Sequence, residues 1–353
     1  MASIFSSRVS KPIGCSEHAM GGAASQLGLE ALTGLTDMYT CFDDFNQMMT
    51  GTEGTSESAI WEDSSWVLTD DGSAPTGDEI CLNDPANTDV FAPSCLYWFG
   101  GTGDDSGGNM QLDRLNGAIG TLVGSQEFPH IWIPETDAGV TRHDNTVWVF
   151  ATRIGLRADI TTTGSGAWDG KAFIGWAAAG DTSLMTHTDG ELTITSGGEL
   201  IGFHVTELGA IRGISHRTAA TAMAEATNFT ALTAAAAVDG TVANGAVTAG
   251  DTMWFDLALR MNITDMSSDT ANGSTEFFIR RVPRVSGKPG DAGGQLPGQG
   301  SAWARHATVL TNQTPNNDVA LVPTIELLNG PTGGVDCVLF VDWWMFGASR
   351  MSR

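Results

Sequence analysis

The side chains that could do chemistry are present in this chain, but their spacing builds no recognised active site. Its seven histidines show neither the HxH nor the HExxH spacing that places two imidazoles on one metal ion. No GxSxG, P-loop or GxGxxG sequence lies between a predicted strand and a predicted helix, where hydrolases, NTPases and dinucleotide-binding enzymes carry them. We therefore expect a protein that is not an enzyme and that holds no cofactor and no metal ion.

Carboxylates could act in pairs, as they do in glycoside hydrolases. Adjacent aspartates occur at 43–44, 70–71 and 104–105, but neighbours along a strand point to opposite faces and cannot share one proton. The ExDxE string typical of sandwich glucanases is absent. We interpret these pairs as solvated turn residues, with a calcium site as the alternative.

Two tryptophans are the candidate ligand contacts. Trp168 belongs to the Gly-rich loop 161–170 and Trp303 follows the long loop 286–301. An exposed indole offers a flat apolar face on which a sugar ring can stack. These loops and the loop 100–109 are therefore the candidate glycan-binding region.

A single histidine lies inside a clear strand pattern. In the segment 199–207, Ile201 and Phe203 share one face, and His204 lies on the opposite face. A histidine in this position is expected to be at the surface or to have its hydrogen bonds satisfied, rather than to bind a ligand.

The apolar run 335–347 predicts a strand that is apolar on both faces, which is typical of a central or covered strand. Core packing of Trp343 and Trp344 is therefore favoured over an exposed sugar platform. Simple alternation divides the strand into two faces, the first formed by Leu339, Val341, Trp343 and Met345 and the second by Val338, Phe340, Asp342, Trp344 and Phe346.

The five cysteines include no CxxC pair, so neither a disulfide framework nor a thiolate zinc site is indicated. Cys337 stands in an apolar run and is expected to pack as a small hydrophobic side chain. A disulfide between Cys81 and Cys95 is left open.

The charge balance limits the classes of partner. Asp and Glu number 41 against 17 Lys and Arg, which gives a formal net charge of -24. A polyanion repels nucleic acid and anionic membranes, so neither is an expected partner. The first residues show no signal-peptide pattern, because no apolar run follows Arg8 and Lys11, and no stretch is apolar enough to predict a membrane span.

The elements that must position these side chains are short strands. The segments 148–156, 171–180, 199–207, 254–263 and 274–282 alternate apolar and polar residues or are apolar throughout, and Gly, Asp and Thr turns separate them. In 148–156, Phe150 and Ile154 share a face opposite Ala151 and Arg153, which predicts a half-buried strand. Many short strands with almost no amphipathic helix predict an all-β antiparallel sandwich of jelly-roll type.

The domain organisation follows from the same pattern. Residues 1–38 are small, rich in Gly and Ala, and are expected to form an extended N-terminal arm. Residues 39–350 are expected to form one jelly-roll domain with an irregular insertion at about 71–145 and long loops at 218–250 and 286–301.

Seven of these segments, in order, resemble a family of phage structural proteins with a laminin-G or concanavalin-like jelly roll. The resemblance covers about 39–70 and 146–347 and leaves 71–145 unmatched. It is carried by CFDDFN, VWVFATRIGL, KAFIGWAAAGDTSL, ELIGFHV, MWFDLALRMN, STEFFIRRV and VDCVLFVDWWMFG.

The resemblance implies a non-enzymatic virion protein that decorates or cements the outer surface of an icosahedral capsid and assembles in the host cytoplasm. Its implied partners are the major capsid protein of the same phage and further copies of itself, as a homotrimer. A carbohydrate-binding adhesin of the virion is the first alternative, and the major capsid protein itself is the second.

Overall fold

The computed structural model describes the strands of the chain and a few residues beside them. Nothing below refers to the structure of the remaining residues. The described ranges are 38–43, 66–70, 80–82, 96–99, 107–112, 131–132, 146–158, 170–178, 184–188, 191–193, 199–206, 211–216, 224–226, 253–265, 272–282, 304–306, 309–311, 320–329 and 337–349.

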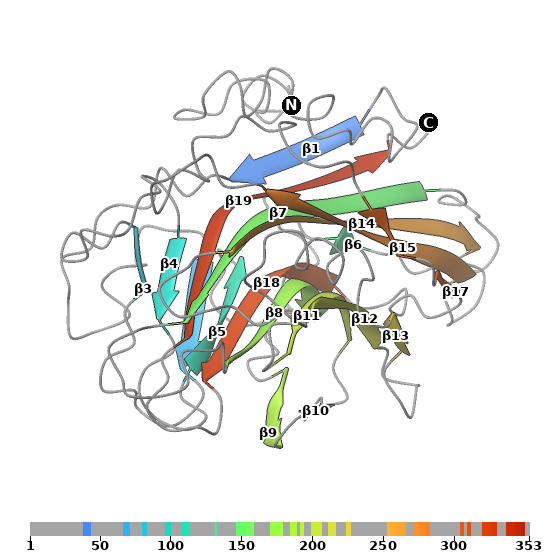
Figure 1. The fold of residues 1–353 in the computed structure, drawn as a ribbon. Helices are drawn as coiled ribbons and strands as arrows, with labels where there is room; N and C mark the ends of the chain where they lie inside the picture. Colours follow the sequence, from blue (N-terminus) through green and yellow to red (C-terminus); the bar gives the residue numbers. More distant parts are fainter. Residues whose placement is uncertain are drawn as a thin grey trace.

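Within these ranges, one layer is a nine-stranded antiparallel sheet, drawn across the upper half of Figure 1. Its path runs β16-β15-β14-β7-β19-β4-β3, with β1 also paired to β19 and β17 to β15. The strands are β1 (Met38–Asp43), β3 (Ile80–Leu82), β4 (Leu96–Phe99), β7 (Thr146–Ala158), β14 (Met253–Asp265), β15 (Asn272–Val282), β16 (Ala304–Arg305), β17 (Leu310–Thr311) and β19 (Cys337–Ser349).

The second layer is an eight-stranded antiparallel sheet with the path β13-β12-β11-β8-β18-β5-β2, and β6 also pairs with β18. A separate two-stranded ribbon is formed by β9 (Thr186–Thr188) and β10 (Glu191–Thr193). The strands of the eight-stranded sheet are β2 (Trp66–Asp70), β5 (Gly107–Leu112), β6 (Ile131–Trp132), β8 (Gly170–Ala178), β11 (Leu200–Val205), β12 (Ile211–His216), β13 (Ala224–Ala226) and β18 (Ala320–Asn329).

The two layers confirm the predicted fold class, an all-β antiparallel sandwich of the concanavalin-like jelly-roll type. The predicted arm 1–38 lies outside the described residues except for Met38, which begins β1. The region 71–145 supplies β3 and β4 to one sheet and β5 and β6 to the other, and β13 lies in the predicted loop 218–250. The loop 286–301 lies outside the described ranges, so the division into domains stays a prediction.

Large aromatic side chains fill the space between the layers. Phe150 of β7 meets Trp176 of β8 with ring centroids 5.4 Å apart, and Phe203 of β11 meets Phe277 of β15 edge-on at 5.5 Å. All four are at most 2% exposed. Burial of one such side chain contributes roughly 1.5–3 kcal/mol, so these contacts between sheets hold the sandwich together.

The face of β7 that points away from the second layer is buried as well. Val149, Ala151 and Arg153 of β7 alternate with the inward-facing residues, yet they are only 2%, 0% and 3% exposed. The predicted half-buried character of this strand is therefore wrong. The alternation itself is right, because Phe150 and Ile154 pack on the opposite face from Ala151 and Arg153.

A bulge in β19 changes the predicted faces of the last strand. Val341 pairs with Ile154 but Trp343 pairs with Arg153, so Asp342 is an extra residue with no partner in the register with β7. The insertion shifts the alternation by one residue. Trp344, opposite Thr152, therefore joins the face of Leu339 and Val341 and is 2% exposed. The predicted faces are wrong for Trp344 and Met345, while core packing of Trp344 is confirmed. The side chain of Trp343 lies outside the described residues.

Candidate functional site

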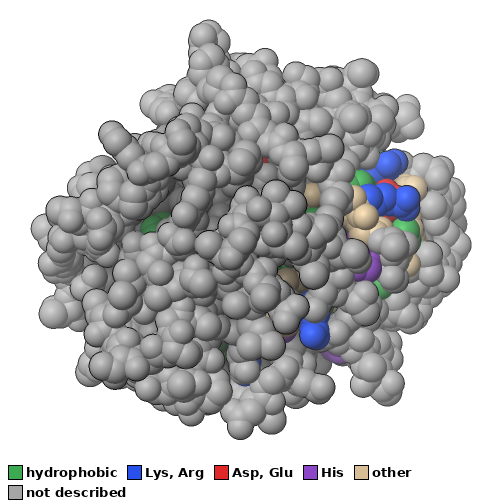
Figure 2. All heavy atoms as spheres, in the orientation of Figure 1, with side chains coloured by type: hydrophobic (Ala, Val, Ile, Leu, Met, Phe, Trp, Pro, Cys, Tyr) green, Lys and Arg blue, Asp and Glu red, His purple; other side chains and the backbone are tan. Residues whose placement is uncertain are grey.

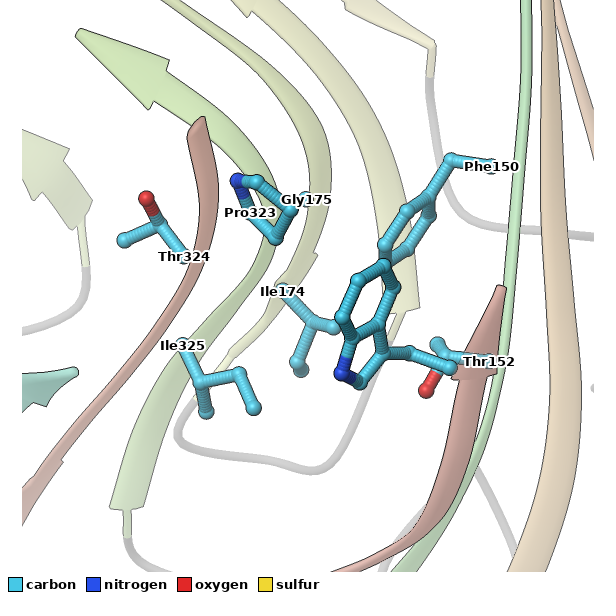
Figure 3. A pocket seen from close by; sticks show the side chains of 8 residues that line it. Phe150, Thr152, Ile174, Gly175, Pro323, Thr324 and Ile325 are labelled. Carbon is cyan, nitrogen blue, oxygen red and sulfur yellow. The ribbon is translucent and has the colours of Figure 1, made fainter. Parts of the chain in front are cut away.

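The gap between the described strands of the two sheets offers no room for a ligand. A narrow gap remains between the layers, and it is too small to admit a water molecule. Figure 3 shows Phe150 and Thr152 on one sheet facing Ile174 and Ile325 on the other across this gap. The buried charged side chains of the described strands lie instead on the outer faces of the two sheets.

The nine-stranded sheet carries a buried ion pair on its outer face. Arg153 of β7 and Asp256 of β14 are direct cross-strand partners, at 3% and 0% exposure. The guanidinium donates from Nε to Oδ1 of Asp256 at 2.7 Å and from Nη2 to Oδ2 at 3.3 Å. Such a two-pronged contact fixes both side chains.

The bulge in β19 brings a second carboxylate to the same arginine. Nη1 of Arg153 donates to Oδ2 of Asp342 at 3.5 Å, and Asp342 is 22% exposed. Burial alone lowers the pKa of Arg153, but the charges and hydrogen bonds of Asp256 and Asp342 outweigh it and raise that pKa above its ordinary value. The guanidinium is permanently charged, so this group fixes three strands and has no proton to exchange.

On the eight-stranded sheet, Glu326 of β18 ties a short segment to the outer face. Its carboxylate accepts hydrogen bonds from the backbone N–H of Leu184 at 3.0 Å and of Met185 at 3.0 Å, and from Nδ2 of Asn109 at 2.6 Å. Glu326 is 1% exposed. A carboxylate that accepts three such bonds is satisfied, so Glu326 acts as an anchor and not as a general base.

The anchored segment closes an apolar cluster. Leu184 and Met185, at 0% and 1% exposure, lie against buried side chains of β8, β11, β12 and β18. The other members of the cluster are Phe173, Ala177, Leu200, Ile214 and Leu328. The outer face of this sheet is thus a second, smaller core.

His204 lies in the same outer face. It pairs with Phe173 of β8 on one side and with Arg212 of β12 on the other. It is opposite Ile201 and Phe203, as predicted, but it is only 3% exposed, and neither ring nitrogen has a hydrogen-bond partner among the described residues. The prediction of a surface or satisfied histidine is therefore wrong.

The electrostatics around His204 keep its ring neutral. Burial, together with the charges of Arg212 and Lys171, lowers the pKa of His204 to about 3. Lys171 of β8 is itself only 3% exposed. Lys171 and Phe173 are two residues apart, so both project from the same side of β8.

A partly exposed charged cluster lies on the outer face of the nine-stranded sheet, near its edge. Glu276 of β15 forms two ion pairs. Its Oε1 lies 2.5 Å from Nη2 of Arg305, and its Oε2 lies 3.7 Å from Nη1 of Arg260, which is its cross-strand partner. Arg305 is 53% exposed. Figure 2 shows described Lys and Arg side chains beside an acidic one on the side of the molecule where β14 and β15 lie. Exposed pairs of this kind are typical of protein surfaces.

The sequence-predicted glycan contacts, Trp168 and Trp303, lie outside the described residues. So do the loop 286–301 and, except for Gly170, the loop 161–170; the loop 100–109 is described only from Gly107 onward, where β5 begins. Cys81 stands in β3, but its side chain and Cys95 are outside the description, so the predicted pair stays open.

Sequence reasoning missed Lys171, Arg212 and Glu326. Each is the single Lys, Arg, Asp or Glu of its strand, and a charge at such a position is the signal that could have drawn attention to it. Within the described part of the chain, no group of three or more His, Cys, Asp or Glu side chains is arranged to hold a metal ion. The described ranges also hold no helix of the length and apolar character that crossing a membrane requires.

Comparison with known proteins gives structural neighbours alone. No family model and no curated protein matches the sequence. Among solved structures, peanut lectin with a 9mer peptide is similar at 10% identity and a TM-score of 0.42, over 90% of this chain and 100% of the lectin.

Two further plant lectins are similar at the same level. Basic winged bean lectin with Tn-antigen has 12% identity and a TM-score of 0.39, over 88% of this chain and 98% of its own. Lectin I from Ulex europaeus, in complex with the methyl glycoside of alpha-L-fucose, has 8% identity and a TM-score of 0.39, over 89% and 99%. At these scores the likeness carries no argument about function.

Proposed function

We propose that this chain is a non-enzymatic structural protein of a bacteriophage virion that decorates the outer surface of the capsid. The observation that carries the proposal is that buried charged side chains of the chain hold its strands and segments together. On one sheet, Arg153 is hydrogen-bonded to Asp256 and Asp342. On the other, Glu326 is hydrogen-bonded to the backbone of Leu184 and Met185. Such contacts stiffen a scaffold and leave these groups no proton or lone pair for a substrate.

The resemblance to phage structural proteins supports the same proposal. Six of its seven motifs correspond to most of β7, β8, β11, β14, β15 and β19, and the first begins in β1. The motifs therefore lie on strands of the two sheets, which is expected if the resemblance reflects a shared fold. The formal charge of -24 keeps such a protein soluble and away from packaged DNA.

The proposed partners are the major capsid protein and other copies of the chain in a homotrimer, on the capsid exterior after assembly in the host cytoplasm. The test is quantitative mass spectrometry of purified particles from the source phage, followed by localisation in an electron-microscopy map. We expect a fixed ratio to the shell protein and density over the whole head.

Each other outcome assigns a different role. A few copies at the tail, with glycan binding lost in Trp168→Ala or Trp303→Ala, would identify the adhesin. Closed shells formed by the isolated chain would identify the major capsid protein. Turnover of a substrate that is abolished by a single carboxylate substitution would overturn the non-enzymatic assignment.

A further inference from the structure

Three basic side chains meet on the outer face of the eight-stranded sheet. Arg212 and His204 are direct cross-strand partners in β12 and β11. Phe173 is the partner of His204 in β8, and Lys171 follows Phe173 on the same side of that strand. Lys171, His204 and Arg212 therefore come from three adjacent strands, and the charges of Lys171 and Arg212 both act on the imidazole.

Two of the three side chains, those of Lys171 and His204, are buried, which is unusual for a chain with so few cations. Lys171 is one of three lysines in the sequence, and it is 3% exposed. His204 is equally buried, and neither Nδ1 nor Nε2 has a hydrogen-bond partner among the described residues. Buried polar atoms in proteins are almost always paired with protein, water or a ligand, so this imidazole requires an explanation.

We propose that Lys171, His204 and Arg212 form a binding site for a small oxyanion, a carboxylate or a phosphate. Its oxygen accepts the N–H of the neutral imidazole, and the ammonium and guanidinium balance its charge. Lys171 and Arg212 also make other contacts, and the site requires their charges rather than open donors. The proposal does not depend on a role in a virion.

The local charges decide which kind of ligand fits. Two fixed cations beside the imidazole repel a metal ion, which would otherwise be the usual ligand of a neutral histidine. An anion reverses their effect, because its charge favours protonation of His204, whose pKa is lowered to about 3 without it. The net charge of -24 repels anions at long range, so the attraction for the anion must come from this local group.

The test is isothermal titration of the full chain with inorganic phosphate and, separately, with acetate, at constant ionic strength. We expect saturable binding of at least one of them, and we expect the dissociation constant to rise about tenfold or more in His204→Gln and Arg212→Gln. His306→Gln is the matched control, because His306 is also buried, at 6% exposure, but follows β16 in the other sheet. It should bind as the wild type does.

A second readout uses the wild-type chain and does not depend on how well the variants fold. The ¹⁵N resonances of the His204 imidazole should shift on saturation with the bound anion, while those of His306 should not. Binding of phosphate alone or acetate alone selects the ligand class. The proposal is overturned if neither anion binds saturably, if His204→Gln binds as well as the wild type, or if the His204 resonances do not move.

Discussion

Arg153 and Asp256 show how a single pair of residues can determine the stability of a sheet. Both are almost fully buried, and their two-pronged contact joins β7 to β14. Replacing such a pair by apolar residues can be neutral, whereas removing one partner leaves a buried charge without compensation. The importance of the pair is therefore seen only when the two residues are changed separately.

Arg153→Met should lower the free energy of unfolding by about 3–5 kcal/mol, because it leaves the buried carboxyl group of Asp256 without its ion-pair partner. Urea denaturation of the purified variant measures this. Arg305→Met is the control, since Arg305 is 53% exposed and its loss should change stability by at most about 0.5 kcal/mol. The double variant Arg153→Met with Asp256→Leu should regain most of the loss. If Arg153→Met is no less stable than the control, the pair does not stabilise the fold.

His204 predicts an acid sensitivity with a definite sign. Its pKa is about 3 in the folded chain, against an ordinary value of 6.5, so the unfolded state takes up the proton first as pH falls. The contribution of neutral His204 to the free energy of unfolding is therefore complete above pH 6.5 and is lost as pH falls from there toward 3. By pH 5 the loss should reach about 2 kcal/mol, before most carboxylates titrate.

The measurement is urea denaturation between pH 8 and pH 5 in a buffer without phosphate or carboxylate. His204→Gln should remove about 2 kcal/mol of the fall in stability over this range. His306→Gln should leave the profile of the wild type. Equal slopes in the wild type and His204→Gln would show that His204 is not neutral and buried in the folded chain.

Among the elements, β12 depends on a glycine that faces the opposite sheet. A Cβ added at Gly213 would lie 2.4 Å from the ring of Phe277, a separation that real side chains do not tolerate. Gly213→Ala should therefore cost about 1–3 kcal/mol through overpacking. In a double-mutant cycle measured by urea denaturation, Gly213→Ala with Phe277→Leu should lose clearly less than the sum of the single variants. Additive losses would contradict this contact.

The long strands could be predicted from the sequence because each carries its own alternating pattern. The segments 148–156, 199–207 and 254–263 appear as β7, β11 and β14. Two-residue strands such as β6 and β16 carry too few residues for any periodicity. The bulge at Asp342 also has no local signal, since it depends on pairing with β7.

The candidate site could not be predicted for a related reason. Lys171 lies 33 residues before His204, and cross-strand register alone brings both of them and Arg212 to one face. A shift of one residue in any of these strands would move its side chain to the opposite face. The covered outer faces are equally hidden, because Arg153 and His204 read as solvent-facing residues in an alternating pattern.

For the whole molecule, the dominant quantity is the excess of carboxylates. A formal charge of -24 destabilises the folded state through self-repulsion, which salt screens as the Debye length falls from about 30 Å at 0.01 M to about 8 Å at 0.15 M. The melting temperature should therefore rise over this range of sodium chloride, by about 2–4 °C for each kcal/mol gained. Equimolar potassium chloride should act identically. A melting temperature that is flat or falls with salt would show that repulsion does not limit stability.

The positions of β18 and β19 govern when this chain can fold during its synthesis. β19 lies between β7 on one side and β4 and β1 on the other, and β18 lies between β8 and β5. These are the last two described strands to leave the ribosome, yet each occupies the middle of a layer. Until β18 and β19 are synthesised, the strands that pair with them have unpaired edges. Neither sheet can therefore be complete before these strands are translated. A product truncated before β19 is expected to aggregate through these unpaired edges.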